Sequence, residues 1–211
     1  MNDTNSTSIK NLKKLSPPHL KSIREHLEYD DNFLKTLTNN SPDIYIRFWE
    51  LTSYAIILGR SNSKENEVKL KKTNTIPIIK RASGGGTVLL GPGCLCYSLF
   101  IPTGFTPCSN ISKTNSFIMN TLKDSLEPLN SNITIRGYID LCINDIKFSG
   151  NAQRRTKDAI LFHGTILYNF DLQMIEQTLK HPSKEPDYRK KRSHKEFLTN
   201  LSAKKTNLIN C

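Results

Sequence analysis

A chain of 211 residues is long enough for one substantial domain and short for two. Its 30 Lys and Arg residues outnumber 19 Asp and Glu residues, and the net charge of +11 favours an anionic partner such as a nucleotide, an acidic protein or a nucleic acid. Hydrophobic residues make up 36% of the chain, which is enough for a core, but no apolar run reaches the roughly 18 residues that a membrane span requires.

Residues 1–19 are predicted to form a flexible N-terminal arm, because they are rich in Asn, Ser, Thr and Lys and contain Pro17-Pro18. One domain is expected over residues 20–211. The arm lacks the apolar core and cleavage site of a secretory signal, so a cytoplasmic protein without a membrane partner is expected. The cysteines lack the paired spacing of a metal site, and no structural metal is expected. Cys94 and Cys96 are predicted to be small, buried apolar side chains.

The predicted elements of the first half begin with a helix over 20–37, where apolar residues recur at helical spacing between charges. Residues 43–49 alternate as a strand does, and 54–58 is a short apolar strand that ends at Gly59. A short charged helix is predicted within 62–72, and another strand at 76–79. Residues 87–90 and 94–101 flank Gly91-Pro92-Gly93, which predicts a hairpin.

In the second half, apolar residues three and four apart predict a helix over 116–129. Short strands are predicted at 133–135, 141–143 and 160–168, with a turn at Asn144-Asp145. A last helix, over 171–180, takes Asp171 as its N-cap. Because strands and helices do not alternate regularly, the predicted fold class is α+β, with a mixed, largely antiparallel sheet packed with helices.

The segment from Lys80 to Val88 contains three consecutive glycines, Gly84, Gly85 and Gly86, directly after two cations and a serine. Such a run lets backbone N–H groups approach a phosphate or carboxylate, while Lys80, Arg81 and Ser83 could complete an anion site. It is neither a Walker motif nor a dinucleotide-binding fingerprint. A plain hairpin loop is the alternative.

Two further segments carry candidate chemistry. Lys147 stands on a predicted strand just ahead of Ser149-Gly150-Asn151-Ala152, where its ammonium could point at an anion. His163-Gly164-Thr165 lies inside an apolar stretch, where the histidine is either a hydrogen-bonded core residue or part of the same site. Most lysines are solvated, so each segment is weak evidence by itself.

In this order the three segments resemble the catalytic module of the lipoate–protein ligase A family, which is related to biotin protein ligases and octanoyltransferases. The resembling pieces are Arg-x-Ser-Gly-Gly-Gly-x-Val, Lys-x-x-Gly-Asn-Ala-Gln and His-Gly-Thr-x-Leu. The likeness covers roughly residues 20–180. It implies the class II synthetase-like fold of the biotin/lipoate ligase catalytic domain, in a short form without the C-terminal accessory domain.

The resemblance implies that the chain activates lipoate or octanoate with ATP and Mg²⁺ as an acyl-adenylate. The acyl group then passes to a lysine of an apo lipoyl domain of a 2-oxoacid dehydrogenase, or of a glycine-cleavage H protein. It implies that Lys147 is the catalytic residue and that Asp140 helps to hold Mg²⁺. The acyl-adenylate pocket would be formed by Arg81, Ser83, Gly84, Gly85, Gly86, Val88, Gly150, Asn151, Ala152, His163, Gly164 and Thr165. The strands at 87–90 and 94–101 would border a tunnel for the acyl chain.

Two features depart from this family. Many members read Gly-Arg-Asn-Asp before the lysine strand, whereas this chain places Ile139 ahead of Asp140, which weakens the nucleotide or metal contact there. Few residues follow the matching region, and they include a basic segment from about residue 182. That segment is either a solvated surface, a cover over the adenylate or a dock for an acidic lipoyl domain. A separate accessory subunit is a possible further partner, and the sequence leaves open whether one is required.

The nearest alternative function is an ATP-independent octanoyl- or lipoyltransferase that works through a cysteine thioester, since Gly91-Pro92-Gly93 resembles that branch. Such chemistry needs a reactive thiolate. Cys142 is close to Lys147 in sequence but is predicted on an apolar strand. A transferase that uses no cysteine also stays open. A nucleic-acid-binding module is the remote alternative, because the charge suits it but its usual motifs are lacking.

Overall fold

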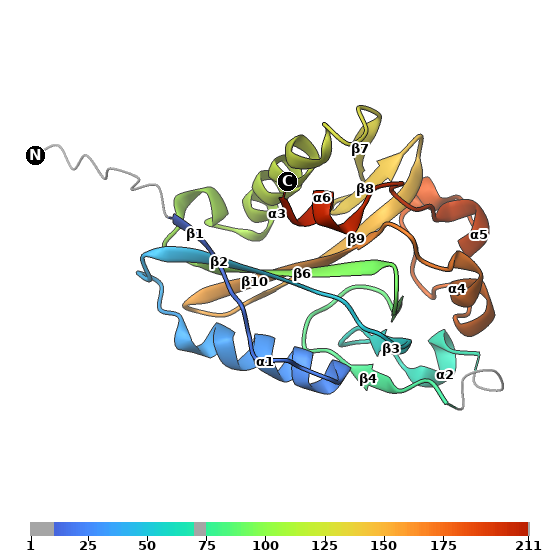
Figure 1. Ribbon diagram of the computed structural model, residues 1–211, viewed down its shortest axis with the longest axis horizontal. Coiled ribbons are helices and arrows are strands. Elements are labelled where there is room, and N and C mark those ends of the chain that lie inside the picture. Colours follow the sequence, from blue (N-terminus) through green and yellow to red (C-terminus); the bar gives the residue numbers. More distant parts are fainter. Residues whose placement is uncertain (1–10, 70–74, 211) are drawn as a thin grey trace, which may run out of the picture.

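A computed structural model of the protein describes residues 11–69 and 75–210, in which a seven-stranded sheet forms the centre (Figure 1). Only the first strand runs parallel to its neighbour, and the other pairs are antiparallel. The α+β prediction with a mixed, largely antiparallel sheet is therefore confirmed. In spatial order the strands are β1 (Asn11–Lys14), β2 (Asp43–Trp49), β6 (Cys94–Pro102), β10 (Ala159–Leu167), β9 (Ile146–Arg155), β8 (Asp140–Ile143) and β7 (Ile133–Arg136).

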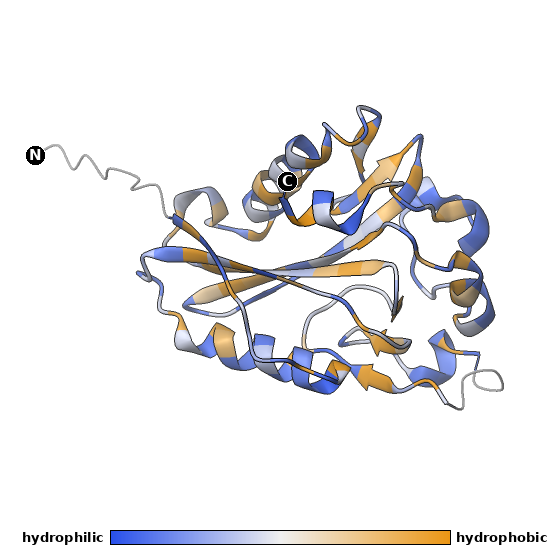
Figure 2. Cartoon of the chain, in the orientation of Figure 1, coloured by the Kyte–Doolittle hydropathy of each residue, from blue (hydrophilic) through white to orange (hydrophobic). Residues whose placement is uncertain are grey.

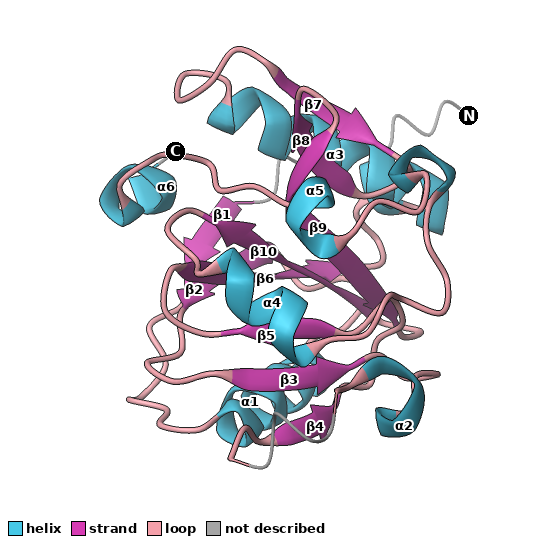
Figure 3. Ribbon diagram, turned by 90° about the vertical axis from the view of Figure 1, so that its right-hand side faces the viewer, coloured by secondary structure: helices cyan, strands magenta, loops and turns pink. Residues whose placement is uncertain are grey.

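A smaller sheet takes the order β4-β3-β5, with β3 at Ala55–Leu58, β4 at Ile78–Lys80 and β5 at Val88–Leu90 (Figure 3). The predicted hairpin between 87–90 and 94–101 is wrong, because β5 pairs with β3 in the small sheet while β6 lies in the large one. Gly93 takes a φ of +84°, and its carbonyl oxygen accepts from the N–H groups of Tyr168 and Asn169. The Gly-Pro-Gly segment thus anchors a crossing between sheets.

The helices start at the residues whose side chains cap them. Ser22 caps α1 (Ile23–Thr36) through a reciprocal pair with Glu25, and Asn110 caps α3 (Ile111–Leu126). Asp171 caps α4 (Leu172–Thr178), as predicted. The helix expected over 116–129 begins five residues earlier, at the cap. Of the helix expected within 62–72, α2 covers Lys64–Glu67, and residues 70–72 lie outside the described part of the chain.

Side chains of β6 are divided among three buried clusters. Leu95, Tyr97 and Leu99 of β6 belong to the core beneath α3, whereas Cys94 and Cys96 belong to the core shared with the small sheet and α4. The hydropathy colouring shows the apolar strands between polar helix surfaces (Figure 2). Since every residue of β6 is buried, both faces of this strand are covered. Among the described residues, no helix combines the length and apolarity that crossing a bilayer requires.

The N-terminal prediction differs from the structure at β1, whose residues pair in register with the start of β2. Backbone pairing and a contact of 2.5 Å between Lys13 Nζ and Asp43 Oδ2 hold this strand. Neither feature leaves a pattern in the sequence Asn11-Leu12-Lys13-Lys14. Residues 1–10 of the predicted arm lie outside the described residues.

The basic C-terminal segment folds against the body of the molecule, so the interpretation of a purely solvated surface is wrong. It forms η3 (Asp187–Arg189), α5 (His194–Phe197) and α6 (Lys205–Asn210). Phe197, Leu201 and Leu208 are each at most 3% exposed. The short η2 (Thr106–Cys108) precedes α3 elsewhere in the chain.

Candidate active site

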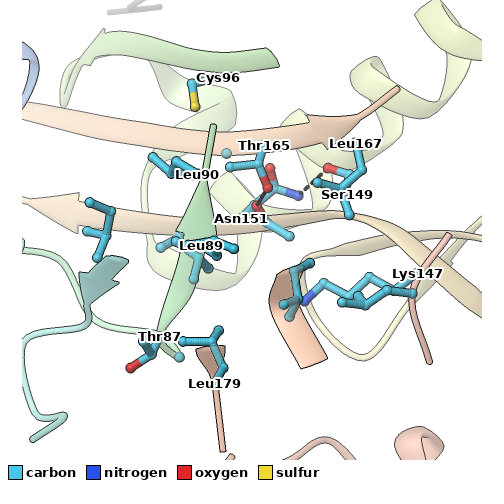
Figure 4. A pocket seen from close by; sticks show the side chains of 18 of the residues that line it. Thr87, Leu89, Leu90, Cys96, Lys147, Ser149, Asn151, Thr165, Leu167 and Leu179 are labelled. Carbon is cyan, nitrogen blue, oxygen red and sulfur yellow. Dashed lines mark hydrogen bonds between the residues drawn. The ribbon is translucent and has the colours of Figure 1, made fainter. Parts of the chain in front are cut away.

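A pocket of ≈ 250 Å³ opens on the face of the large sheet that carries the small sheet (Figure 4). Such a volume exceeds that of packing voids, which rarely hold more than one water molecule. Most of the predicted site residues line it: Arg81, Gly86, Val88, Lys147, Gly150, Asn151, Ala152, His163, Gly164 and Thr165. Ser83 and Asp140 contact lining residues, and Gly84 and Gly85 belong to the loop beside them.

Other lining residues were missed by sequence reasoning because they come from distant elements. The apolar wall includes Leu27 of α1, Trp49 of β2, Ile175 of α4 and Leu179. Leu89, Leu90 and Cys96 of the two predicted tunnel strands do lie there, as expected. The C-terminal segment supplies a further wall, made of Pro182, Lys184, Pro186, Arg189, His194, Phe197 and Leu198.

Arg81 holds the glycine loop in shape. Its guanidinium donates to the carbonyl oxygens of Gly84 at 2.7 Å and Gly86 at 2.8 Å, and to Ser83 Oγ at 3.0 Å. Gly85 has a φ of +89°, and a Cβ there would lie 2.9 Å from the guanidinium. Arg81 is only 8% exposed, and its hydrogen bonds stabilise the loop. Its guanidinium is therefore bonded within the protein, in contrast to the free countercharge that was predicted. Among residues 11–69 and 75–210, no atom would lie within 4 Å of a Cβ added at Gly84 or Gly86.

His163 joins β10 to this loop. Its Nε2 lies 2.7 Å from Ser83 Oγ, which also accepts from Arg81. Burial, followed by the charge of Arg81, lowers the pKa of His163 to about 3. The imidazole is therefore neutral at physiological pH, and Ser83 can donate to Nε2 while accepting from Arg81. This chain of hydrogen bonds fixes the loop to the sheet, and it also makes His163 a poor proton donor.

Lys147 has a carboxylate partner and a glycine beside it. Its Nζ lies 2.8 Å from Asp140 Oδ1 on the neighbouring strand β8. A Cβ at Gly150 would lie 2.7 Å from that Nζ, so only glycine leaves room for the lysine side chain in this position. The lysine side chain is 25% exposed, which leaves its ammonium accessible from the pocket.

Asp140 also meets the C-terminal segment, since Tyr188 donates from its hydroxyl to Asp140 Oδ2 at 2.6 Å. Both carboxylate oxygens are thus engaged by side chains of this chain. Among the described residues, no group of three His, Cys, Asp or Glu side chains could hold a metal ion. Because Mg²⁺ commonly binds through one carboxylate and substrate phosphates, the residues fit an ion that arrives with a nucleotide better than a resident one.

One row of residues crosses five strands on the pocket face. The register places Trp49, Cys96, Thr165, Gly150 and Asp140 side by side on β2, β6, β10, β9 and β8. Neighbouring strands lie about 4.8 Å apart, so the row measures roughly 19 Å. It runs from a carboxylate that pairs with Lys147 to an indole at the apolar end.

Asn151 and Tyr97 of the neighbouring row also line the pocket, but their polar groups bond to each other and, through Asn151, to α3. Asn151, next to Gly150, donates to the Ile139 carbonyl at 2.7 Å and to the Met119 sulfur of α3 at 3.5 Å, and Tyr97 donates from its hydroxyl to Asn151 Oδ1. A Cβ at Gly164 would lie 1.7 Å from that Oδ1. Asn151 thus lines the pocket, as a wall of the predicted nucleotide site would, while its amide is bonded on the side of α3.

Trp49 is held from behind by a buried polar cluster. His26 stacks on its ring at 4.2 Å, and the Arg47 guanidinium lies 5.2 Å from it. Arg47 is fully buried, and it donates to Asp30 at 2.6 Å and to the His26 carbonyl at 2.8 Å. Fixed charges and ring stacking thus set the indole that forms the apolar end of the row.

The four described cysteines are all buried and free. Burial raises the pKa of Cys142 to about 11 and that of Cys108 to about 11, and it raises the pKa of Cys96 well above its ordinary value. These thiols stay protonated at neutral pH, as the prediction of buried apolar cysteines requires.

Comparison with known proteins gives the family. A sequence model described as "Lipoyl protein ligase A/B catalytic domain" matches residues 22–209. A probable lipoate-protein ligase A of Mycoplasma genitalium is 33% identical over 170 residues, which are 76% of this chain and 49% of that protein. An inactive lipoate–protein ligase 2 of Plasmodium falciparum is 29% identical over 180 residues, which cover 69% of this chain and 47% of that protein. The chain spans about half the length of these curated relatives.

Solved structures show the same fold. A lipoate-protein ligase A bound with ATP superimposes with a TM-score of 0.77 at 22% identity, over 95% of this chain and 81% of that one. A bi-partite lipoate protein ligase from Thermoplasma acidophilum superimposes with a TM-score of 0.78 at 22% identity, over 95% of this chain and 79% of that one. With a family match that covers most of its length, this chain belongs to the lipoyl protein ligase A/B catalytic domain family.

Proposed function

We propose that this chain activates lipoate or octanoate with ATP as an acyl-adenylate and transfers the acyl group to a lysine of a lipoyl carrier domain. The acceptor is the apo lipoyl domain of a 2-oxoacid dehydrogenase or a glycine-cleavage H protein. Mg²⁺ enters with the nucleotide, and a separate accessory subunit is proposed as a further partner. The similar Thermoplasma protein, described as a bi-partite lipoate protein ligase with its E2 lipoyl domain, supports both partners.

The observation that carries the proposal is the row from Asp140 to Trp49, with Lys147 at its polar end. Lys147 offers an accessible ammonium over Gly150, and the distance from Gly150 to Trp49 is three strand spacings, about 14 Å. An extended eight-carbon acid measures roughly 9 Å, given C–C bonds of about 1.5 Å. A carboxylate beside Lys147 therefore places the end of its tail near Cys96, two strand spacings away, with the Trp49 indole one spacing beyond as the apolar end of the pocket.

The chemistry has two steps. A carboxylate oxygen of the acid attacks the α-phosphorus of ATP, and the bond to pyrophosphate breaks. The acceptor ε-amine then attacks the acyl carbonyl, an amide forms and AMP leaves. Lys147 offsets the negative charge that gathers between the carboxylate and the α-phosphate, where a fixed cation outside bulk water is most effective. The glycine loop contributes free space and backbone N–H groups, and Arg81 with Ser83 and His163 keeps it in shape.

The cysteine-dependent transferase is less well supported. A thioester route needs a thiolate, and burial keeps Cys96, Cys108 and Cys142 protonated at neutral pH. The nucleic-acid-binding alternative also loses support, because Arg47, Arg81 and Arg189 are each at most 8% exposed and bond inside the protein.

The test is acylation of a purified apo lipoyl domain, followed by the intact mass of the acceptor. One arm supplies lipoate with Mg-ATP, a second supplies preformed lipoyl-adenylate, and a third supplies an octanoyl carrier protein without ATP. The proposal expects the lipoyl mass increment in the second arm, and in the first once any accessory subunit is added. Acylation only in the third arm would contradict it.

A matched variant addresses the thioester route directly. Cys142→Ser keeps a polar hydrogen beside Tyr188 but removes the sulfur. Adenylate chemistry predicts transfer within about twofold of the wild type and no covalent acyl-enzyme in the intact mass. A stable acyl adduct on the wild type that the variant lacks would favour the transferase.

A further inference from the structure

The C-terminal segment contacts the lysine strand at Lys147 itself. Lys147 lies in the part of β9 that does not pair with β10, and there it forms a parallel β-bridge with Leu198. Thr199 donates its N–H to the Lys147 carbonyl at 2.9 Å. Leu201 donates its N–H to the carbonyl of Leu167, the last residue of β10, at 2.7 Å. The segment therefore takes the place of a strand beside the backbone that carries the candidate catalytic residue.

Tyr188 of this segment reaches the side-chain partner of Lys147. Its hydroxyl donates to Asp140 Oδ2 at 2.6 Å, while Asp140 Oδ1 lies 2.8 Å from Lys147 Nζ. The tyrosine ring is itself fixed, since Phe197 lies 5.3 Å away, centroid to centroid, and the Arg136 guanidinium lies 5.8 Å from the ring. The result is a three-membered chain, Tyr188–Asp140–Lys147, whose first member comes from an element remote in sequence.

The chemistry of the chain requires a neutral tyrosine. Burial, and then the charge of Asp140, raise the pKa of Tyr188, so the phenol keeps its proton and remains a donor. The torsion that orients a carboxylate is broad and roughly two-fold. A donor fixed on one oxygen therefore holds the plane of the carboxylate, which keeps the other oxygen facing the lysine.

We propose that Tyr188 is a positioning residue that acts through Asp140 to hold the Lys147 ammonium over Gly150. This inference rests on the proposed role of Lys147 and makes the C-terminal segment a part of the catalytic machinery. It also gives Asp140 the task of orienting a lysine in place of holding Mg²⁺. Oriented second partners of this kind commonly set the geometry of a reactive group.

The test uses Tyr188→Phe, which keeps the ring and removes one hydroxyl. Its matched control is Tyr138→Phe, the same change on a side chain that is 87% exposed in the turn before Asp140. Transfer from lipoyl-adenylate to the apo lipoyl domain is measured with both. We expect kcat to fall roughly tenfold in Tyr188→Phe with the KM for the acceptor unchanged, since a hydrogen bond to a charged group is lost. Tyr138→Phe should match the wild type.

A double-mutant cycle separates positioning from a general structural role. In an Asp140→Asn background, Tyr188→Phe should change kcat by less than about twofold, because the path to Lys147 is already broken. The proposal would be overturned if the fold-losses in kcat of the two single variants multiplied in the double variant. It would also be overturned if Tyr188→Phe had the same kcat as Tyr138→Phe. Equal thermal midpoints of the variants confirm that folding is intact.

A readout without turnover keeps this inference distinct from the proposed function. The rate at which an amine-reactive acetylating reagent labels Lys147 is measured by peptide mass spectrometry. We expect labelling to be faster in Tyr188→Phe than in the wild type or Tyr138→Phe, because the carboxylate no longer holds the ammonium. Equal rates would contradict the positioning role. Absence of acyl transfer in the wild type would instead count against the ligase proposal.

Discussion

Two adjacent rows of the large sheet carry the candidate motifs, and they face opposite ways. On the pocket face, Gly150 and Thr165 sit opposite each other and Lys147 lies over Gly150. On the α3 face, Asn151 and Gly164 sit opposite each other and interlock with Tyr97. Each motif contributes alternate residues to each row, because side chains of a strand alternate between its faces.

The two glycines therefore have different tasks. Gly150 makes room for the flexible end of a lysine, whereas Gly164 makes room for an asparagine amide that is bonded on several sides. A motif that reads as one functional unit in sequence thus divides into a half that serves chemistry and a half that serves packing. Three substitutions test this division, and a fourth tests the histidine that ties the glycine loop to the sheet.

Replacing the lysine should have the largest effect. Lys147→Ala is expected to lower acyl transfer by at least ~100-fold, because the cation at the polar end of the pocket is lost. The thermal midpoint should change little, since the side chain is partly exposed. Lys113→Ala, on an exposed position of α3, is the matched control. Activity of Lys147→Ala close to that of the control would remove Lys147 from the mechanism.

Adding one methyl group on the pocket face should reduce activity more than stability. In Gly150→Ala the new Cβ would lie 2.7 Å from Lys147 Nζ and 2.8 Å from its Cε, so the lysine must move. We expect a fall in kcat of about 10- to 100-fold, as for other displacements of a reactive group by about 1 Å. Urea unfolding should stay within about 1 kcal/mol of the wild type, because the end of a lysine yields easily. A stability loss without an activity loss would contradict the assignment.

The same methyl group on the α3 face should act in the opposite sense. In Gly164→Ala the Cβ would lie 1.7 Å from Asn151 Oδ1 and 2.8 Å from the Tyr97 hydroxyl. We expect a loss of about 1–3 kcal/mol in the free energy of unfolding, typical of overpacking a core. Urea titration beside Gly150→Ala measures the difference. Equal stability of the two variants would show that the two rows do not differ in this way.

The histidine that ties the glycine loop to β10 should make stability depend on pH. Since burial lowers the pKa of His163 to about 3, the unfolded chain binds a proton near pH 6.5 while the folded chain does not. Stability is therefore full above pH 6.5 and falls on acidification toward pH 3. Between pH 7 and pH 5 we expect a loss of about 1–2 kcal/mol from this group. Urea titrations of wild type and His163→Gln check this, because the variant should lose correspondingly less; an equal loss in both would argue against it.

Much of the site could be predicted because its signals are local. Three glycines after Arg81, a lysine before Ser-Gly-Asn-Ala and His-Gly-Thr on an apolar strand are each visible in a few residues. Residues of all three segments line the pocket. Alternation along 147–152 could also have shown that Asn151 and Gly150 face opposite sides. The fold class followed from element types in the same way.

The remainder depends on long-range contacts that leave no local pattern. Tyr188 approaches Asp140 from 48 residues away, and Trp49 joins the pocket through its pairing with Cys96. The strands β5 and β6 lie in two different sheets because Gly93, between them, is hydrogen-bonded to residues 168 and 169 and to Glu50. These partners are distant in sequence, so the residues around the turn do not reveal the separation. Pairing of β1 is likewise set by the backbone of β2.

The most direct test of the central claim is the count of AMP released per acceptor lysine acylated, with lipoate, Mg-ATP, an apo lipoyl domain and any accessory subunit present. Adenylate chemistry at the Lys147 pocket predicts one AMP for each acylated lysine, and both products reduced by at least ~100-fold with Lys147→Ala. Acylation that proceeds without AMP release, or that Lys147→Ala performs at the wild-type rate, would contradict the account.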